Sequence, residues 1–338
     1  MSDHEPVVVI DQLTKSYGEF TAVDNVSLTL DRGRILGFIG PNGAGKTTTI
    51  KILVGLAKPT SGSASIAGAD CVRDARRIKR LVGYMPDTFG SYDNMRVREY
   101  LDFFGAAFGI PRKPRLARIA EVMETTNSTY MQDRYVETLS HGMKQRVGIA
   151  RTLLHDPDVL VFDEPANGLD PEARIEMREL LLRLAEMGKT LIVTSHILPE
   201  LSRICDQVAI IHQGKLMAFG MLDDILRQLD QHRMIEVQLA STEAMEQAVT
   251  LLRESLQAGT EINTSLAEAT IRFRTALDET ALSQVLAKLV QAGVLVTQFR
   301  ELQTDLEDAF MTVTRRGESQ QATSEAVPVV SNEEETSS

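Results

Sequence analysis

The spacing of hydrophobic residues changes along this chain of 338 residues, and each spacing predicts a different kind of structure. Short apolar runs predict strands at Val7–Ile10, Val26–Leu30, Ile35–Ile39, Val82–Met85, Val159–Phe162 and Leu191–His196. The later runs are almost wholly apolar, as is typical of parallel strands covered on both faces. From about residue 92 to 154 the apolar positions recur at helical spacing, interrupted by a predicted surface loop at Pro111–Pro114. We therefore expect an α/β fold with a helical subdomain at about residues 90–154.

A separate pattern follows Leu229. Its order of elements is βαββαβ, which predicts a ferredoxin-like α+β module at residues 230–315. The expected strands are Met234–Leu239, Glu261–Thr264, Thr270–Arg274 and Val294–Phe299, the expected helices are Thr242–Leu256 and Glu279–Gln291, and a short helix follows at Leu306–Met311. From Gly317 onward the chain has five glutamates and no basic residue, so residues 316–338 are predicted to be a disordered tail.

Charge and cysteine content narrow the possible classes of function. With 36 basic and 47 acidic residues the formal net charge is −11, which argues against a nucleic-acid partner. The two cysteines are far apart, which argues against a disulfide scaffold or a zinc site. The acidic N-terminus lacks a secretory signal, and no apolar run reaches the roughly 18 residues of a membrane span. We expect a cytoplasmic protein.

The residues from Gly40 to Thr47 fit the phosphate-loop pattern G-x-x-x-x-G-K-[ST], between a predicted strand and a predicted helix. Glycines let successive backbone N–H groups point at an anion, and the helix N-terminus adds a positive dipole end. Lys46 would reach the β- and γ-phosphates, and the Thr47 hydroxyl would ligate Mg²⁺. The loop predicts binding of a nucleoside triphosphate; the alternative is a glycine-rich turn that only feeds a helix.

Two adjacent carboxylates, Asp163 and Glu164, follow a buried strand, where packing does not explain them. In a nucleotide site Asp163 would hold Mg²⁺, directly or through water, and Glu164 would polarise the attacking water. His196 ends the next strand of this kind, although a lone histidine is more often structural. Because Gly40, Asp163 and His196 follow the carboxyl ends of strands in one predicted sheet, we expect them to converge.

Two further positions suit nucleotide contacts, and each also has a plain structural interpretation. Ser140 is a good N-cap, and its helix start could present N–H groups and a hydroxyl to an anion. Tyr17, in a turn-like setting, could stack on a base or be a partly buried loop tyrosine. Asp170 and Pro171 predict the N-cap and first residue of a helix that ends near Gly188.

Taken in order from about Val7 to Leu229, these motifs resemble the nucleotide-binding subunit of ATP-binding cassette (ABC) transporters. The resemblance places the Walker A loop at Gly40–Thr47, the signature at Leu139–Gln145, Walker B at Val159–Glu164 and the D-loop at Gly168–Asp170. It implies a P-loop ABC fold for residues 5–229, with a mixed sheet core. It also implies that Glu164 and His196, the switch histidine, are catalytic, and that Thr47 and Asp163 hold the metal. The implied ATP-binding residues are Tyr17, Gly40, Pro41, Asn42, Gly43, Ala44, Gly45, Lys46, Thr47, Thr48, Ser140 and Gly142.

The sequence departs from the family pattern at a few positions. His141 and Met143 stand where the signature usually has glycine and glutamine. Asp87 stands where most members have glutamine; it would contact Mg²⁺ through water, or else form a turn or cap a helix. Ala166 replaces a frequent small polar residue, with little expected consequence.

The resemblance implies an ATPase that uses ATP and Mg²⁺ and works as two cassettes head to tail, expected to be a homodimer. The C-terminal layout, closing in Leu306 to Phe310, resembles cassettes that serve exporter-class (type-2) permeases. We therefore expect a transport ATPase held at the cytoplasmic face of the membrane by a separate permease, with no nucleic acid involved. The alternatives are a soluble ABC ATPase not coupled to transport and a non-catalytic, nucleotide-gated scaffold.

Overall fold

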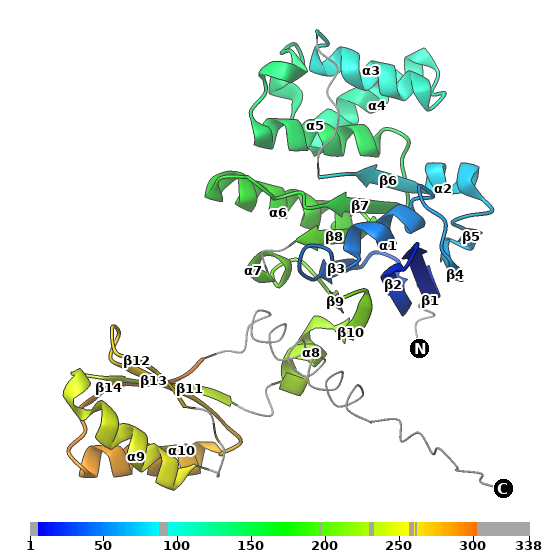
Figure 1. Cartoon of the computed structure of the whole chain (residues 1–338). Helices are drawn as coiled ribbons and strands as arrows, with labels where there is room; N and C mark the ends of the chain where they lie inside the picture. Colours follow the sequence, from blue (N-terminus) through cyan, green and yellow to red (C-terminus); the bar gives the residue numbers. More distant parts are fainter. Residues whose placement is uncertain are drawn as a thin grey trace, which may run out of the picture. The chain divides into compact units, whose positions relative to one another are not determined.

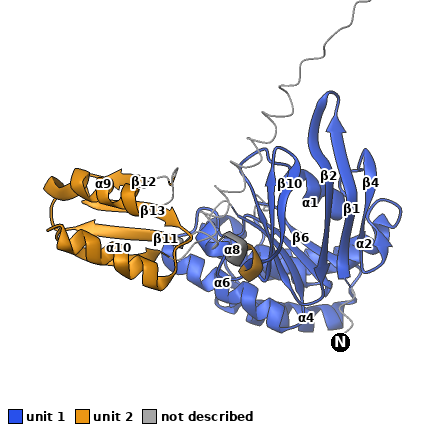
Figure 2. Ribbon diagram, turned by 90° about the horizontal axis from the view of Figure 1, so that it is seen from below, with its two compact units in different colours: residues 1–222, 312–338 blue, residues 223–311 orange. Residues whose placement is uncertain are grey.

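A computed structural model describes residues 6–87, 94–195, 198–229, 233–256, 260 and 262–302 of the chain (Figure 1). The chain divides into two compact units, residues 1–222 with 312–338 and residues 223–311 (Figure 2). We predicted the boundary after Leu229, whereas α8 (Leu222–Leu229) lies almost wholly in the second unit. The helix predicted at Leu306–Met311 and the tail predicted at 316–338 lie outside the described residues.

The first unit contains two sheets. The larger has the strand order β10-β9-β3-β8-β7-β6 and is parallel except for β10 at its edge. Its strands are β3 (Ile35–Ile39), β6 (Val82–Met85), β7 (Val159–Asp163), β8 (Thr190–Ser195), β9 (Gln207–His212) and β10 (Lys215–Met221). The smaller sheet is antiparallel and has the order β2-β1-β4-β5. It is formed by β1 (Pro6–Tyr17), β2 (Phe20–Asp31), β4 (Ser61–Ile66) and β5 (Ala69–Asp70).

The burial of the central strands follows from their composition. Every residue of β3, β7 and β8 is buried, as expected of parallel strands covered on both faces. Phe38 and Val161 of this sheet belong to one hydrophobic core with Ile50 of the first helix. The helices that connect these strands are α1 (Lys46–Leu53), α2 (Ala75–Leu81), α6 (Pro171–Glu186) and α7 (Leu198–Leu201).

The first two strands are longer than the short apolar runs predicted. The β1–β2 pairing shifts register between Ile10 and Leu13, and Gln12 has a φ of +47°. This irregularity lets polar residues interrupt the alternation without ending the strand. Tyr17, which we expected in a turn, is therefore the last residue of β1 and pairs with Phe20.

The helical subdomain contains three long helices. They are α3 (Val97–Ala107), α4 (Arg112–Thr125) and α5 (His141–Leu153), with two short 3₁₀ turns, η1 (Thr129–Met131) and η2 (Val136–Thr138). The predicted surface loop at Pro111–Pro114 is wrong, because Pro111 is the N-cap of α4 and the next three residues are its first turn. First-turn N–H groups have no acceptor within the helix, so Pro114 costs no hydrogen bond there.

The second unit has its own core. Its sheet is wholly antiparallel with the order β12-β13-β11-β14, and both long helices cover one face (Figure 1). The elements are β11 (Arg233–Leu239), η3 (Thr242–Ala244), α9 (Met245–Ser255), β12 (Ile262–Ser265), β13 (Thr270–Thr275), α10 (Glu279–Gln291) and β14 (Val296–Leu302). Ile235, Val237 and Phe273 point into a core with Leu252 and Leu289. Order and pairing are those of a ferredoxin-like fold.

None of the described helices is long and apolar enough to cross a membrane.

Candidate nucleotide-binding site

A cleft of about 420 Å³ lies at the carboxyl ends of β3, β6 and β7. This is the edge at which open α/β sheets bind ligands. The cleft is lined by Phe20, Ala22, Asn42, Gly43, Ala44, Gly45, Lys46, Thr47, Thr48, Asp87, Asp163, Glu164 and Asn167. The structure thus brings residues 42–48 of the loop together with Asp163 and Glu164. Of the three residues that the sequence predicted to converge, Asp163 lines the cleft, Gly40 is not among its described lining residues, and His196 lies outside the described residues.

The loop before α1 requires glycine at two positions. Gly45 has a φ of +107°, and a Cβ there would lie 2.5 Å from the carbonyl oxygen of Ala22. A Cβ on Gly40 would lie 2.3 Å from the carbonyl oxygen of Ile211. Neither acceptor is the end of a flexible side chain, so the loop cannot hold this shape with larger residues. The shape leads the chain into the N-terminus of α1, whose free N–H groups favour an anion.

Lys46 is held against the loop. Its side chain is only 6% exposed, and Nζ donates to the carbonyl oxygens of Gly40 at 2.6 Å and Pro41 at 3.2 Å. Burial lowers the pKa of Lys46 below its usual value, while the charges of Glu164 and Asp163 oppose this shift. A buried ammonium group beside backbone carbonyls is placed to exchange these partners for phosphate oxygens.

Asp163 is oriented by two threonines from neighbouring elements. Thr194 of β8 donates to Oδ1 of Asp163 at 2.7 Å, and Thr47 of α1 donates to Oδ2 at 3.4 Å. The Thr194 hydroxyl also accepts from the backbone N–H of Glu164 at 2.9 Å. Thr194 was not predicted from the sequence, because what marks it is its pairing with Asp163 in the parallel register of β7 and β8.

The backbone at Glu164 is strained. Its φ is +55°, in the left-handed region that residues other than glycine seldom adopt. Such conformations cost about 1–3 kcal/mol and cluster at functional sites, where the surrounding structure fixes them. Here the hydrogen bond from Glu164 N–H to Thr194 fixes the turn out of β7.

The oxygen atoms at the cleft suit a magnesium ion that is also bound by phosphate. The Thr47 hydroxyl and the Asp163 carboxylate face each other at 3.4 Å. Among the described residues there is no group of three or more His, Cys, Asp or Glu that could hold a metal unaided. Mg²⁺ is commonly held by one or two carboxylates with the rest of its ligands from phosphate and water.

An aromatic residue that the sequence analysis missed lies at the cleft. Phe20 lines it and is 63% exposed, whereas Tyr17 is not among its described lining residues. The two are paired across the β1–β2 hairpin, and Lys15 Nζ lies 4.7 Å from the centre of the Tyr17 ring. Phe20 could have been identified from its position, because only two residues separate it from Tyr17 and a tight hairpin places the two side by side.

Asp87 lines the cleft beside β6, and its Oδ1 accepts a hydrogen bond from Nδ2 of Asn167 at 3.3 Å. Asn167 was not predicted; it follows Glu164 in a turn closed by its own N–H on the Glu164 carbonyl oxygen at 3.1 Å. Residues 88–93 and His196, the predicted switch histidine, lie outside the described residues.

Ser140 and Gly142 are not among the described residues that line this cleft. They open α5, where the Ser140 hydroxyl accepts from the N–H of Met143 at 3.3 Å and caps the helix. The Asp170 carboxylate caps α6 in the same way, and both caps were predicted from the sequence.

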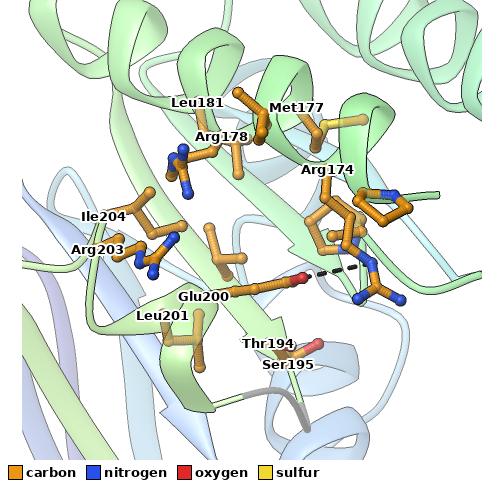
Figure 3. A pocket seen from close by; sticks show the side chains of 15 residues that line it. Arg174, Met177, Arg178, Leu181, Thr194, Ser195, Glu200, Leu201, Arg203 and Ile204 are labelled. Carbon is orange, nitrogen blue, oxygen red and sulfur yellow. Dashed lines mark ion pairs between the residues drawn. The ribbon is translucent and has the colours of Figure 1, made fainter. Parts of the chain in front are cut away.

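A second pocket, of about 240 Å³, lies between α6, β8 and α7 (Figure 3). Its wall is largely apolar, with Met177, Leu181 and Ile204, and it contains an ion pair between Arg174 and Glu200 at 3.5 Å. No phosphate-loop residue lines it. It is therefore separate from the cleft that holds Lys46.

Comparison with known proteins shows the family to which the chain belongs. The sequence model described as ABC transporter matches residues 23–167. Over 306 residues the chain is 30% identical to the linearmycin resistance ATP-binding protein LnrL of Bacillus subtilis (strain 168), covering 90% of this chain and 97% of that one. The chain belongs to the ATP-binding proteins of ABC transporters. The family predicted from the motifs is confirmed.

Two further relatives show how far the likeness extends. The chain is 38% identical over 221 residues to the Nod factor export ATP-binding protein I of Ralstonia nicotianae, covering 65% of this chain and 69% of that one. It is 37% identical over 224 residues to the probable multidrug ABC transporter ATP-binding protein YbhF of Escherichia coli (strain K12). That match covers 66% of this chain but only 39% of YbhF.

Solved structures confirm the cassette fold. The structure of an ATP-binding subunit of an ABC transporter is 31% identical, with a TM-score of 0.60, covering 66% of this chain and 93% of that one. A dimeric ATP-binding cassette in a post-hydrolysis state, bound to ADP and phosphate, is 25% identical, with a TM-score of 0.57, covering 64% and 98%. As a member of this family the ABC protein described here binds nucleotide.

Proposed function

We propose that this chain hydrolyses ATP and thereby drives export through a separate membrane permease. The observation that carries the proposal is the convergence of Lys46, Thr47, Asp163 and Glu164 in one cleft. No single motif requires that arrangement, and the hydrolysis of a nucleoside triphosphate uses all four side chains.

Each side chain has a distinct task in this proposal. Lys46 binds the β- and γ-phosphates in place of the loop carbonyls that it now contacts. Thr47 and Asp163 hold Mg²⁺, which when bound neutralises the charge that develops on the phosphates. Glu164 accepts the proton of the attacking water, and its backbone, fixed by Thr194, directs the carboxylate at the end of β7. His196 is proposed to contact the γ-phosphate on the resemblance alone.

We propose that the base of ATP stacks on the exposed aromatic pair of the β1–β2 hairpin. Phe20 lines the cleft itself, and Tyr17 lies opposite it in the hairpin. Aromatic faces stack on any base with little selectivity.

The active unit is proposed to be a dimer of two copies of this chain. Ser140 and Gly142 open a helix of 13 residues, yet they are not among the described residues lining the cleft of their own chain. A second copy arranged head to tail would place its α5 N-terminus on the γ-phosphate. The dimeric state of the related cassette structure supports assembly of two copies.

The permease is proposed to dock on a groove of about 270 Å³ in the first unit. Leu56, Tyr84, Phe104 and Phe108 are among its lining residues, and Leu56 and Phe108 are 63% and 44% exposed. Exposed apolar side chains gathered at one groove mark an interaction surface. The names of the relatives, which include multidrug, Nod factor export and resistance proteins, support a partner that moves a substrate outward.

Co-purification from detergent-solubilised membranes tests the coupling to transport. The tagged chain should retain a polytopic membrane protein, and Leu56→Asp should reduce the amount retained. Leu116→Asp is the matched control, since Leu116 is 48% exposed on α4 and is not among the residues lining the groove. If ATPase activity is present but no membrane protein is retained, the alternative of an ABC ATPase not coupled to transport holds instead.

A further inference from the structure

Two residues that depart from the family pattern, His141 and Asp87, contact the same third residue. Nε2 of His141 lies 2.9 Å from the carbonyl oxygen of Asn167, and the Asn167 side-chain amide donates to Asp87 at 3.3 Å. His141 is the first residue of α5, while Asp87 follows β6 at the nucleotide cleft. Asn167 thus connects the start of the signature helix with the cleft of the same chain.

The contact at His141 has a defined donor. A carbonyl oxygen only accepts, so Nε2 of His141 carries the proton and donates to Asn167. The amide of Gln145, which is 1% exposed, lies 3.4 Å from the same Nε2. Oε1 of Gln145 has no hydrogen-bond partner among the described residues; with the amide rotated by 180° it would face this N–H. The ring also lies against Gly168, where a Cβ would be 3.6 Å away.

The other side of Asn167 belongs to the catalytic turn. Its N–H closes the turn on the Glu164 carbonyl oxygen at 3.1 Å. Its amide then fixes the carboxylate of Asp87, which shares the cleft with Thr47 and Asp163. A glycine at position 141 would leave the Asn167 carbonyl without this donor, so the side chain at 141 bears on the placement of this turn.

We propose that His141 and Asn167 are positioning residues that set where Asp87 stands relative to the magnesium-binding oxygens. This inference rests on the proposed function, because it assumes that Mg²⁺ binds with ATP at Thr47 and Asp163. His141 positions Asn167, and Asn167 in turn positions Asp87 beside the proposed magnesium ligands; His141 itself is not among the described residues lining the cleft. The start of α5, which the proposed dimer presents to the nucleotide of the partner, is thereby coupled to the cleft of its own chain.

The test measures binding rather than turnover. Glu164→Gln is used as the background, and the Mg²⁺ concentration that gives half-maximal ATP binding is determined by equilibrium titration. His141→Leu removes the donor but keeps a side chain of helix-compatible shape, and His141→Gln restores an N–H donor. Asn167→Leu removes the amide but keeps the carbonyl that His141 contacts.

His141→Leu and Asn167→Leu should each raise the half-maximal Mg²⁺ concentration about 3- to 10-fold, the scale of one lost hydrogen bond. His141→Gln should return it close to the background value. With Asp87→Ala added, neither leucine substitution should shift it further, because the proposed path ends at Asp87. The thermal unfolding midpoint of each variant identifies any that fails to fold.

Two results distinguish a failure of the proposed function from a failure of the positioning role alone. If the Glu164→Gln protein binds no ATP at any Mg²⁺ concentration, the proposed function itself is wrong. If it binds ATP but His141→Leu and Asn167→Leu leave the Mg²⁺ dependence unchanged, only the positioning role is wrong. Equal shifts with and without Asp87 would also contradict that role, since Asp87 would then not be the residue they act through.

Discussion

At the scale of single residues, one buried hydroxyl organises the acidic end of the cleft. Thr194 is fully buried, donates to Asp163 at 2.7 Å and accepts from the N–H of Glu164 at 2.9 Å. It therefore fixes both the proposed metal ligand and the proposed base. Because a misplacement of about 1 Å can cost two orders of magnitude in rate, this hydroxyl should matter for catalysis without touching ATP.

Thr194→Val should lower the ATPase rate about 10- to 100-fold, because Asp163 loses a donor and the Glu164 N–H loses its acceptor. It should also cost about 1–3 kcal/mol of unfolding free energy. Thr190→Val is the matched control: this threonine is equally buried at the other end of β8 and accepts from the N–H of Gly33 at 2.9 Å. A control variant that loses as much activity as Thr194→Val would show that only general stability is involved.

At the scale of elements, the sequence predicted contiguous features well. The strands Ile35–Ile39 and Val82–Met85 and the helix Glu279–Gln291 have the predicted bounds. The two strands are short apolar runs, and the apolar residues of the helix recur at helical spacing. The chain around Gln12 lacks such a period, so β1 was predicted too short. Two prolines within four residues favour a loop, but prolines also suit a helix start, and the structure places Pro111 and Pro114 at the start of α4.

At the site too, residues that lie next to one another in the sequence were predicted, whereas residues brought together by the fold were not. Gly40 to Thr47, Asp163 and Glu164 are read from short motifs, since neighbours in sequence carry the chemistry. Thr194 and Asn167 are fixed by strand register and by a turn, so no local pattern marks them. The two departures, His141 and Asp87, could be named from the sequence, but their common contact with Asn167 needed the structure.

The groove between β6 and the helical subdomain contains a histidine whose pKa is lowered by burial. His155 stacks on Phe108 at 4.1 Å between ring centroids, and its Nε2 donates to the Val82 carbonyl oxygen at 3.0 Å. Burial lowers the pKa of His155, despite the opposing effect of the hydrogen bond to Val82. Nδ1 has no hydrogen-bond partner among the described residues.

This histidine should make the first unit less stable in acid. A histidine whose pKa is lower folded than unfolded binds more protons when unfolded, so its stabilising contribution is complete above the unfolded value of 6.5. That contribution is lost as the pH falls from 6.5 toward the lowered folded pKa. Thermal unfolding midpoints across this range should fall more steeply for the wild type than for His155→Gln, which keeps a donor but does not titrate. Parallel curves would contradict a lowered pKa for His155.

At the scale of the whole molecule, the chain combines a cassette with a separately packed α+β unit. The cleft of the first unit holds the phosphate loop and the carboxylates, while Ser140 and Gly142 open a helix whose start is not part of that cleft. The second unit has its own apolar core, and its Glu236 carboxylate is held by Arg272 at 2.7 Å and Arg300 at 2.6 Å. Burial alone would raise the pKa of Glu236, but the hydrogen bonds and the charges of the two arginines together outweigh it, so the net shift is downward.

The most direct test of the central claim is sedimentation of the Glu164→Gln protein with ATP and Mg²⁺, together with its hydrolysis rate. Without the proposed base it should bind ATP, cease to hydrolyse it and sediment as a dimer. Adding Ser140→Arg should abolish the dimer while leaving ATP bound to the monomer, because a large cation at the start of α5 blocks contact with the partner's phosphate. Hydrolysis by Glu164→Gln at close to the wild-type rate, or a dimer that survives Ser140→Arg, would contradict an ATPase whose cleft is completed by a second copy.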